Sequence, residues 1–424
     1  MLHSLKKRLY FIVSAYFVFW AKFILRRWKP RIVIITGSSG KTTLLHMVEA
    51  QIGDQAVYSH NANSAFGISF HLLGLAPNVP SKLAWLKYFL VAPFHIFKTV
   101  PTQTLYIVEA DCDRPREGEL TARFVKPEVV LWVSLSHTHS MNFDNLVKSG
   151  KFATHELAIA HEFGNFARAA SKLVIANSDY PAINSELQNL ASKVPIQKVS
   201  VSSLTGYELT ASTTKFKLAD QEVTLPGIHP KEAGASLQMV TKLLQYLGLP
   251  FDASFSKFHM PPGRNNILLG KNNLTIIDST YNTGLGASIA VLNLFSQFPA
   301  VTKWLVIGDI LEQGSIEQAE HEQLASQLAK TGAAQIILLG QRNKTYTLPV
   351  LQKLNLPVVA YDSPKDVLDY INAHIKGEEA ILFKGAQGLE GVIEQLLVNP
   401  ADAAKLVRRG QLWIKRRQAW GLPK

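Results

Sequence analysis

Short apolar runs along the chain alternate with longer stretches in which apolar residues recur every three or four positions. The longer stretches, such as SIEQAEHEQLASQLAKTG (315–332), have the spacing of amphipathic helices. The short runs have the length and composition of buried strands and cover residues 31–36, 104–110, 128–135, 172–177, 274–279, 303–309, 334–340 and 380–385. Strands that alternate with helices favour parallel sheets covered by helices, so we predict an α/β fold.

A break in this pattern falls at HMPPGRNN (259–266), where prolines and a glycine separate two series of strands and helices. We therefore predict a larger domain over residues 31–258 and a smaller one over residues 259–424. Residues 1–30 form a separate apolar segment ahead of the first strand. A chain of 424 residues is long enough for more than one domain.

The N-terminal segment is apolar from Leu9 to Leu25, apart from Ser14 and Lys22, and is basic at both ends. As a helix this stretch reaches roughly 25 Å, slightly less than the ~30 Å hydrocarbon core of a bilayer. No small-residue cleavage site follows it. We favour a helix that lies in or dips into the inner leaflet; a true span and a helix buried in the protein are the alternatives. In either membrane case residues 1–29 locate the protein and stand apart from its core.

Two further stretches favour a membrane surface. Residues 85–98 (WLKYFLVAPFHIFK) are apolar and rich in aromatics, and residues 405–424 are basic with interleaved tryptophans and no acidic residue. A core helix is the alternative for the first stretch and a solvated tail for the second.

Composition narrows the class of protein. Apolar residues make up 47% and charged residues 18%, as in a packed globular protein. The net charge of +12 suits a nucleotide, a nucleic acid or anionic lipid. The single Cys112 excludes an internal disulfide framework and a cysteine-based zinc site, which favours a reducing cytoplasm.

The stretch IVIITGSSGKTTLL (32–45) runs from a buried strand through a glycine-bracketed turn into a helix. This arrangement aims backbone N–H groups and the positive end of the helix dipole at one spot, where a phosphate fits. Lys41 can then reach the outer phosphates of ATP and Thr42 can ligate Mg²⁺. The full Walker pattern is not met, because Ile35 occupies its first glycine position, and an ordinary strand-to-helix turn is the alternative. The predicted nucleotide-binding residues are Gly37, Ser38, Ser39, Gly40, Lys41, Thr42 and Thr43.

This shortened loop resembles the ATP loop of the Mur ligases, which join amino acids to peptidoglycan precursors. Other segments follow in the order of that family over roughly residues 31–395: HNANSAFGI (60–68), YIVEAD with Glu109, SHTHSMNF with His139, NSDYP, LPGIHP, PPGR with Arg264, IIDSTYN with Asp278 and Asn282, VIGDILEQG followed by His321, and LFKGAQG. The resemblance is closest to the branch that adds D-alanyl-D-alanine to the UDP-muramoyl tripeptide.

The resemblance implies a P-loop ATPase domain with a mostly parallel sheet and a smaller Rossmann-like α/β C-terminal domain. It also implies an ATP-dependent ligase, in which a carboxylate attacks the γ-phosphate of ATP and an amine then displaces phosphate from the acyl phosphate. Such a transfer needs cations around the phosphoryl group. By the resemblance, Lys41 and Mg²⁺ supply them, with Thr42 and Glu109 at one metal and His139 at a second. Arg264, Asp278 and Asn282 match positions that meet the nucleotide when the C-terminal domain closes.

Each of these residues has a simpler interpretation. Glu109 can be a surface carboxylate, His139 a structural histidine and Arg264 a hinge anchor, while Asp278 and Asn282 can cap turns.

The sequence also departs from the family pattern. Where the family carries a carbamylated lysine, local alignment places Thr154, with Lys148 and Lys151 nearby at other spacings. Both asparagines of the Gly-x-His-Asn-x-x-Asn motif are replaced after His229, and Gln387 stands at the position of a substrate-binding arginine.

The expected partners are a UDP-linked or lipid-linked peptidoglycan precursor, an amino acid or dipeptide, and the inner face of the membrane. About thirty residues precede the loop, so we expect a lipid-linked precursor to be held through its lipid. Nucleic acid explains the charge but not the series of Glu, His, Arg and Asp positions, and we expect none. A degenerate ATP-binding membrane protein and a poly-γ-glutamate-type ligase are the alternative functions, and the pattern leaves the oligomeric state open.

Overall fold

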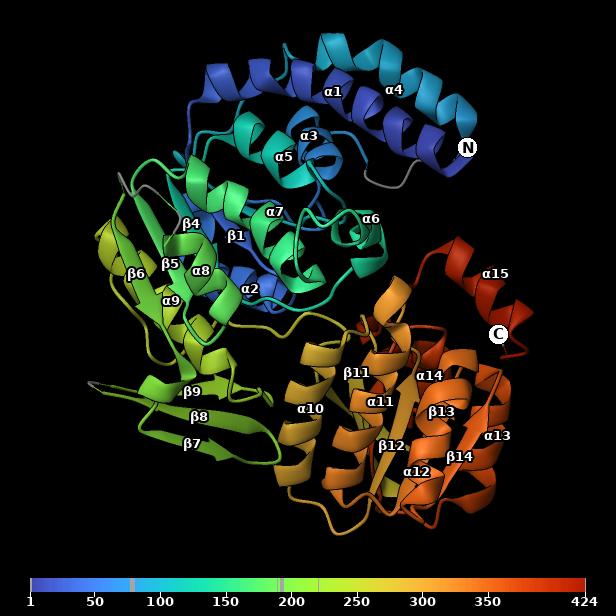
Figure 1. Ribbon diagram of the computed structural model, residues 1–424. Coiled ribbons are helices and arrows are strands. Elements are labelled where there is room, and N and C mark those ends of the chain that lie inside the picture. Colours follow the sequence, from blue (N-terminus) through green and yellow to red (C-terminus); the bar gives the residue numbers. More distant parts are fainter. Residues whose placement is uncertain (1, 77–80, 189, 191–193, 220, 424) are drawn as a thin grey trace. The chain divides into compact units, whose positions relative to one another are not determined.

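The computed structural model describes residues 2–76, 81–188, 190, 194–219 and 221–423 (Figure 1). The chain forms two compact units that interleave along the sequence. The first unit comprises Met1–Leu135, Asn145–Ser200 and Ala235–Phe251, and the second comprises Ser136–Asp144, Val201–Gly234 and Asp252–Lys424. The division into residues 1–30, 31–258 and 259–424 stays a prediction.

The first unit is built on a six-stranded sheet in the order β2-β3-β1-β4-β5-β6, in which neighbouring strands are parallel. Its strands are β1 (Arg31–Thr36), β2 (Ala56–Tyr58), β3 (Leu105–Ala110), β4 (Val129–Trp132), β5 (Leu173–Asn177) and β6 (Ile196–Val199). The central strands are almost continuously apolar and buried, as expected for strands that are covered on both faces.

The helices of this part of the chain are α1 (Leu2–Trp28), α2 (Lys41–Ile52), α3 (Ala65–Leu73), α4 (Lys82–His95), α5 (Glu117–Val125), α6 (Asp144–Lys148), α7 (His155–Ala169), α8 (Pro181–Gln188) and α9 (Ala233–Leu247). Several of these helices begin at a residue whose side chain caps the N-terminus. Ser64 accepts a hydrogen bond from Gly67 at the start of α3, and Thr154 accepts one from Leu157 at the start of α7.

The second unit has a six-stranded sheet in the order β10-β11-β15-β12-β13-β14, in which β10 is antiparallel to β11 and the other pairs are parallel. Its strands are β10 (Asn266–Gly270), β11 (Leu274–Ser279), β12 (Lys303–Gly308), β13 (Gln335–Leu339), β14 (Val358–Tyr361) and β15 (Ala380–Lys384). Helices α10 (Leu285–Gln297), α11 (Glu317–Leu328) and α12 (Leu348–Lys353) contribute to one apolar cluster, whereas α13 (Pro364–His374) and α14 (Leu389–Leu396) contribute to another. A separate antiparallel sheet contains β7 (Gly206–Leu209), β8 (Thr213–Leu218) and β9 (Gln221–Pro226).

The predicted α/β class is confirmed, and every strand predicted from the sequence is present with small differences at its ends. The sequence pattern did not predict the edge strands β2, β6 and β14, nor β7–β9 and β10. The three edge strands have only three or four residues, and β9 and β10 alternate buried and more exposed positions, such as the exposed Ile267 beside the buried Leu268. None of them therefore has the continuous buried apolar run of a central strand.

Helix α1 contributes one face to the core of the first unit. Phe17 and Ala21 are fully buried, and the Phe17 ring packs on Phe66 and Phe70 of α3 with ring centroids 5.7 and 4.8 Å apart. The expectation that residues 1–29 stand apart from the core is therefore wrong for this face. Because the segment is apolar nearly all the way round, it can pack one face on the protein and still expose apolar side chains on the other.

The two other segments predicted at a membrane also pack partly on the protein. Helix α4 lies beside α1, where the Tyr16 hydroxyl donates to the Phe89 carbonyl oxygen at 2.6 Å (Figure 1). The C-terminal segment forms α15 (Gln411–Ala419), and its Arg417 is buried and lies 3.6 Å from Glu394 of α14. The tail is therefore neither a free membrane segment nor a fully solvated one.

Among the described residues, one helix, Leu9–Trp28, has the length and composition needed to cross a membrane, and 28% of its most apolar window is buried inside the protein. A core helix of a soluble protein or a signal sequence can meet the same criterion, so the finding is weak evidence for a span.

The two faces of α1 predict different effects of truncation. Replacing the buried Phe17 with alanine removes its packing on α3 and should lower the free energy of unfolding by about 3–5 kcal/mol. Phe19→Ala, at a side chain that is 53% exposed, is the matched control and should change it by less than about 1 kcal/mol. Denaturant titration of both variants measures this, and equal effects would contradict a core role for α1.

Candidate active site

The loop between β1 and α2 is held tightly against the end of β4. Gly37 and Gly40 have φ angles of 131° and 80°, a region that side chains disfavour. A Cβ atom on Gly37 would lie 2.7 Å from the carbonyl oxygen of Ser134. The backbone N–H groups of Ser38 and Ser39 donate to the carbonyl and hydroxyl oxygens of Ser134, at 3.2 and 2.9 Å. The loop therefore has the close backbone packing that a phosphate cradle requires.

Lys41 opens helix α2 and its ammonium group is buried. It lies 2.8 Å from the Asp111 carboxylate and donates to the Gly37 carbonyl oxygen. Burial lowers the pKa of this ammonium group, but the neighbouring Asp111 and Glu109 carboxylates outweigh burial, and the pKa is raised. Lys41 therefore carries its charge at neutral pH, at the mouth of the loop.

Thr42 and Glu109 come together beside Lys41. The Thr42 hydroxyl donates to Glu109 Oε1 at 3.2 Å, and the Glu109 backbone N–H donates to Ser59 Oγ at 2.9 Å. Glu109 is only 8% exposed, which disfavours the interpretation as a surface carboxylate. Adjacent ligands in an octahedral Mg²⁺ site lie about 3 Å apart, so these two hard oxygen atoms have the spacing of a Mg²⁺-ligand pair.

Asp111 and Ser134 belong to this arrangement but were not predicted as site residues. A usable signal existed, because both follow the carboxyl ends of strands that neighbour β1. The register pairs Ile35 with Glu109 and Thr36 with Trp132, which places all three strand ends at one edge of the sheet. Ligands of open α/β sheets bind at that edge.

His139 lies in the second unit, in a short segment that is held by the loop after β12. Its Nδ1 pairs with the Glu312 carboxylate, while His137 Nδ1 lies 2.7 Å from Glu320 Oε1. The Ser140 hydroxyl donates to Gln313 Oε1 at 3.0 Å. The structure thus gives His139 a carboxylate partner within its own unit, and a role at a second metal stays a prediction.

The position that alignment gives to the family's carbamylated lysine has another role here. Thr154 caps α7 through its hydroxyl oxygen, while Lys148 and Lys151 are exposed. None of these three side chains has the buried setting that a metal-bridging lysine requires.

The C-terminal candidates gather in the second unit around the ends of β11 and β15. Asp278 is fully buried; its Oδ1 accepts hydrogen bonds from the Thr280 backbone N–H and hydroxyl, at 2.9 and 2.6 Å. Burial raises the pKa of its carboxyl group despite these bonds. The Arg264 guanidinium lies over the Tyr281 ring, 3.5 Å from its centroid.

Lys384, which was not predicted as a site residue, is the buried cation of this group. It donates to the Asn282 carbonyl oxygen at 2.6 Å. Burial, followed by repulsion from Arg264, lowers the pKa of its ammonium group to about 7, although Asp278 opposes the shift. The sequence feature that could have indicated Lys384 is its position as a charged residue at the end of a buried apolar strand.

Three further motif positions have structural partners. Gln387 Oε1 accepts a hydrogen bond from the Asp309 backbone N–H at 2.9 Å. His321 is fully buried, accepts from the Ile310 N–H through Nε2 and donates to the Glu317 carbonyl oxygen through Nδ1. His229 is also buried, and burial lowers its pKa to about 4. His229 is therefore neutral at physiological pH, and both histidines have structural hydrogen-bond partners.

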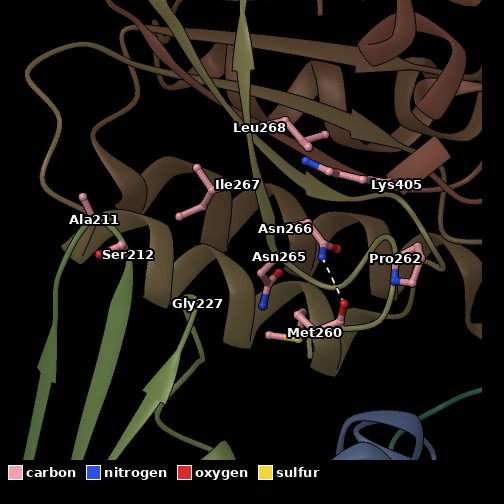
Figure 2. A pocket seen from close by; sticks show the side chains of 10 residues that line it. All are labelled: Ala211, Ser212, Gly227, Met260, Pro262, Asn265, Asn266, Ile267, Leu268 and Lys405. Carbon is pink, nitrogen blue, oxygen red and sulfur yellow. Dashed lines mark hydrogen bonds between the residues drawn. The ribbon is translucent and has the colours of Figure 1, made fainter. Parts of the chain in front are cut away.

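A hollow of about 430 Å³ lies elsewhere in the second unit and is shown in Figure 2. Its lining comes from the β7–β9 sheet and from the segment around β10, with Asn266 Nδ2 donating to the Met260 carbonyl oxygen at 3.4 Å. None of the predicted site residues lines it, so the chemistry described above does not depend on this hollow.

Comparison with known proteins gives one family match: residues 263–387 match the Mur ligase, glutamate ligase domain. The chain is 23% identical over 334 residues to the UDP-N-acetylmuramoyl-tripeptide–D-alanyl-D-alanine ligase of Escherichia coli, covering 74% of this chain and 65% of that enzyme. It is 24% identical to the enzyme of the same name from Synechocystis, covering 88% of this chain and 77% of that enzyme. The chain thus spans a little under two thirds of the length of the Escherichia coli enzyme.

Solved structures agree in fold. MurF from Acinetobacter baumannii has a TM-score of 0.71 at 19% identity, covering 89% of this chain and 78% of that one. MurF from Thermotoga maritima, solved in complex with ADP, has a TM-score of 0.70 at 16% identity, covering 95% of this chain and 84% of that one.

The lowered pKa of Lys384 predicts a characteristic pH dependence of stability. Between about pH 7 and the ordinary lysine value near 10.5, the unfolded chain holds a proton that the folded chain has released. The unfolded state binds more protons there, so this residue makes stability rise with pH over that window and leaves it flat below. The difference in unfolding free energy between wild type and Lys384→Met should show this slope. Lys376→Met removes an exposed lysine and is the control. If the difference in unfolding free energy from wild type did not change with pH for either variant, the lowered pKa of Lys384 would be contradicted.

Proposed function

We propose that this chain, which is related to the Mur ligases over most of its length, is an ATP-dependent ligase that joins a carboxylate to an amine. The observation that carries the proposal is the arrangement of Lys41, Asp111, Thr42 and Glu109 at the carboxyl edge of a parallel sheet. These residues place a buried ammonium group at a glycine-bracketed loop, beside two hard oxygen ligands. Such a site suits a nucleoside triphosphate with its Mg²⁺.

In this proposal the residues of the first unit bind and orient ATP. The backbone of residues 37–43 cradles the phosphates, and Lys41 exchanges part of its contact with Asp111 for the outer phosphates. Its charge then lies where negative charge develops as the γ-phosphoryl group moves to the substrate carboxylate, giving ADP and an acyl phosphate. An incoming amine displaces phosphate and forms the amide. Mg²⁺, held by Thr42 and Glu109, supplies charge neutralisation of the phosphates when bound.

The second unit contributes Arg264, Asp278 and Asn282 in this proposal, with Lys384 as their buried neighbour. Asp278 and the Asn282 carbonyl are held by Thr280 and Lys384, so the loop that follows β11 is rigidly placed. We propose Arg264 and Asp278 as nucleotide-contacting residues and Asn282 as a residue near the adenine. His139 at a second metal is the least supported part, since Glu312 already pairs with it.

We further propose a peptidoglycan precursor as the carboxylate substrate and an amino acid or dipeptide as the amine. The names of the related enzymes, which specify a muramoyl tripeptide and D-alanyl-D-alanine, support this class. Gln387 separates this chain from the family pattern, because a neutral amide stands where an arginine is expected. The acceptor or the amine can therefore differ from those of the named enzymes.

The same proposal places the protein in the cytoplasm at the inner face of the membrane. Helices α1 and α4 lie side by side, and each leaves an apolar stripe exposed. We call these side chains the outer apolar face; they are Leu9, Ile12 and Phe19 on α1, and Leu83, Leu86, Leu90, Phe94 and Phe97 on and after α4. Burying one Leu or Phe side chain in lipid contributes about 1.5–3 kcal/mol, so a few of them suffice to hold the protein at a bilayer. Such a position favours a lipid-linked precursor.

The role of the loop predicts that Lys41→Ala abolishes ATP turnover. Losing this cation at the developing charge should lower the rate of ADP release by about 10²–10³-fold. Purified protein is tested with UDP-linked and lipid-linked muropeptides, each against amino acids and D-alanyl-D-alanine. Lys172→Ala, at an exposed lysine of the first unit, should leave turnover unchanged.

Two outcomes would reject parts of this proposal. Turnover within tenfold of wild type in the Lys41 variant would remove the loop from the mechanism. ATP binding by the wild type without ADP release for any pair of substrates would favour a degenerate ATP-binding protein.

The outer apolar face predicts a specific effect on membrane attachment. Replacing Leu86, Leu90 and Phe94 with glutamine should move the protein to the soluble fraction, because their side chains are exposed and their loss leaves the buried face of α4 intact. Sedimentation with phosphatidylcholine vesicles measures the change. Glutamine at the exposed Val301, Leu354 and Val398 of the second unit is the matched control, and equal release by both sets would argue against the face.

A further inference from the structure

A second hollow, of about 320 Å³, lies in the first unit where α1 and α5 end. Its polar lining is entirely basic and consists of Lys22, Arg26, Lys29, Arg123 and Lys126. The remaining lining residues are apolar, and no acidic residue lines the hollow among the described residues. We call it the basic hollow.

Local structure explains part of this gathering of charge. Arg26 lies in the last turn of α1 and Lys126 caps α5, positions where cations interact favourably with the carbonyl ends of helices. Lys29 and Lys126 both have positive φ angles, 55° and 52°, where the chain reverses after each helix. Arg123 lies in the last turn of α5, so helix ends account for three of the cations and leave the convergence of five in one concavity unexplained.

The basic hollow has little internal compensation for its charge. Arg123 pairs with the exposed Glu119 at 2.7 Å. Within the described part of the chain, Lys22, Arg26, Lys29 and Lys126 form no ion pair with a carboxylate. Like charges that converge in a concave, partly apolar site repel one another and raise the local concentration of anions. An anion that enters the hollow relieves this repulsion. The phosphodiester of an anionic phospholipid carries one negative charge, and about 320 Å³ leaves room for it and part of its headgroup.

The basic hollow is distinct from the nucleotide loop. Pro30 and Ile32, which line it, stand at the start of β1, whereas Gly37 and Lys41 follow the end of the same strand. A strand of six residues is roughly 20 Å long, so one phosphate chain cannot occupy both places.

The sequence of α1 connects the hollow to the outer apolar face. Ile12, Phe19 and Arg26 are spaced by seven residues, two turns of helix, and therefore lie on one side of α1. All three are exposed. The apolar side chains of this stripe match the acyl chains of a bilayer, and the basic hollow at its end matches the phosphate layer that borders them.

We propose that the basic hollow binds the phosphate group of an anionic phospholipid while the outer apolar face contacts the acyl region. This inference rests on the proposed membrane attachment and assigns it a lipid preference. Attachment through apolar side chains alone would not distinguish lipids with a net negative charge from neutral ones. The basic hollow would, because its cations attract a negatively charged headgroup.

The test compares vesicles of phosphatidylcholine with vesicles of phosphatidylcholine and phosphatidylglycerol at two to one, using the full chain. Wild type should bind the anionic vesicles more tightly. Arg26→Gln/Lys126→Gln, with one change from each wall, should lose about tenfold or more of affinity for anionic vesicles and keep its binding to phosphatidylcholine. Lys172→Gln/Lys198→Gln removes the same charge from exposed positions of the first unit and should lose less than threefold.

A soluble arm separates lipid from free phosphate. Short-chain phosphatidylglycerol below its micelle concentration should bind the wild type and not the Arg26/Lys126 variant, and inorganic phosphate should bind far more weakly than either lipid form. Equal affinity for inorganic phosphate would replace the lipid with a free anion and overturn the proposal.

The remaining outcomes are also decisive. Equal losses in the two double variants would show a general charge effect and reject the hollow. Unchanged binding in Arg26→Gln/Lys126→Gln, with release by the glutamine variants of the outer apolar face, would reject the hollow and leave membrane attachment standing. Absence of wild-type binding to any vesicle would reject both.

Discussion

The buried ion pair between Lys41 and Asp111 is the contact on which the geometry of the candidate site in the first unit depends. A buried ammonium group loses hydration, and it is tolerated here because Asp111 and the Gly37 carbonyl oxygen replace water. Those partners come from β3 and from the loop after β1, while Ser134 after β4 fixes the loop from the other side. Such a pair contributes little net stability, so its placement at a phosphate-shaped loop is better explained by function than by folding.

The sequence predicted the parallel strands and the loop because both depend on local patterns. A short continuous apolar run such as IVII favours a buried strand, and glycines before Lys-Thr favour a tight turn into a helix. Asp111 and Lys384 were not predicted, although each lies at the end of a strand. Glu109 and Asp111 are two carboxylates two residues apart, and only the three-dimensional structure shows that Asp111 is the one that pairs with Lys41, at 2.8 Å. His139 shows the opposite limit. Its motif suggested a metal ligand, but Glu312, distant in sequence, supplies a partner that no local pattern reveals.

Helix α1 illustrates why hydrophobicity alone cannot separate a core helix from a membrane helix. Its apolar residues surround the axis, and the structure divides them into Phe17 and Ala21, which pack on the protein, and Ile12 and Phe19, which do not. That division is set by α3 and α4, whose aromatic side chains meet only one side of α1. A helix of this kind can attach the protein to a bilayer only by keeping its inner face folded, so anchoring and folding are coupled in one element.

The second unit carries a different electrostatic constraint, since the buried Lys384 and Asp278 lie close to the partly buried Arg264. Burial lowers the pKa of Lys384 to about 7, so a small change of surroundings alters the charge of this group, and burial raises the pKa of Asp278. Gln387 adds a neutral amide where a guanidinium is expected, and it is already engaged by the Asp309 backbone. A neutral amide cannot form the paired, charge-assisted hydrogen bonds that a guanidinium makes with a carboxylate. In the proposed ligase, a substrate at this end of the sheet would meet less fixed positive charge than in the family pattern, so the proposed difference between this chain and its relatives lies in the carboxylate or amine substrate rather than in ATP.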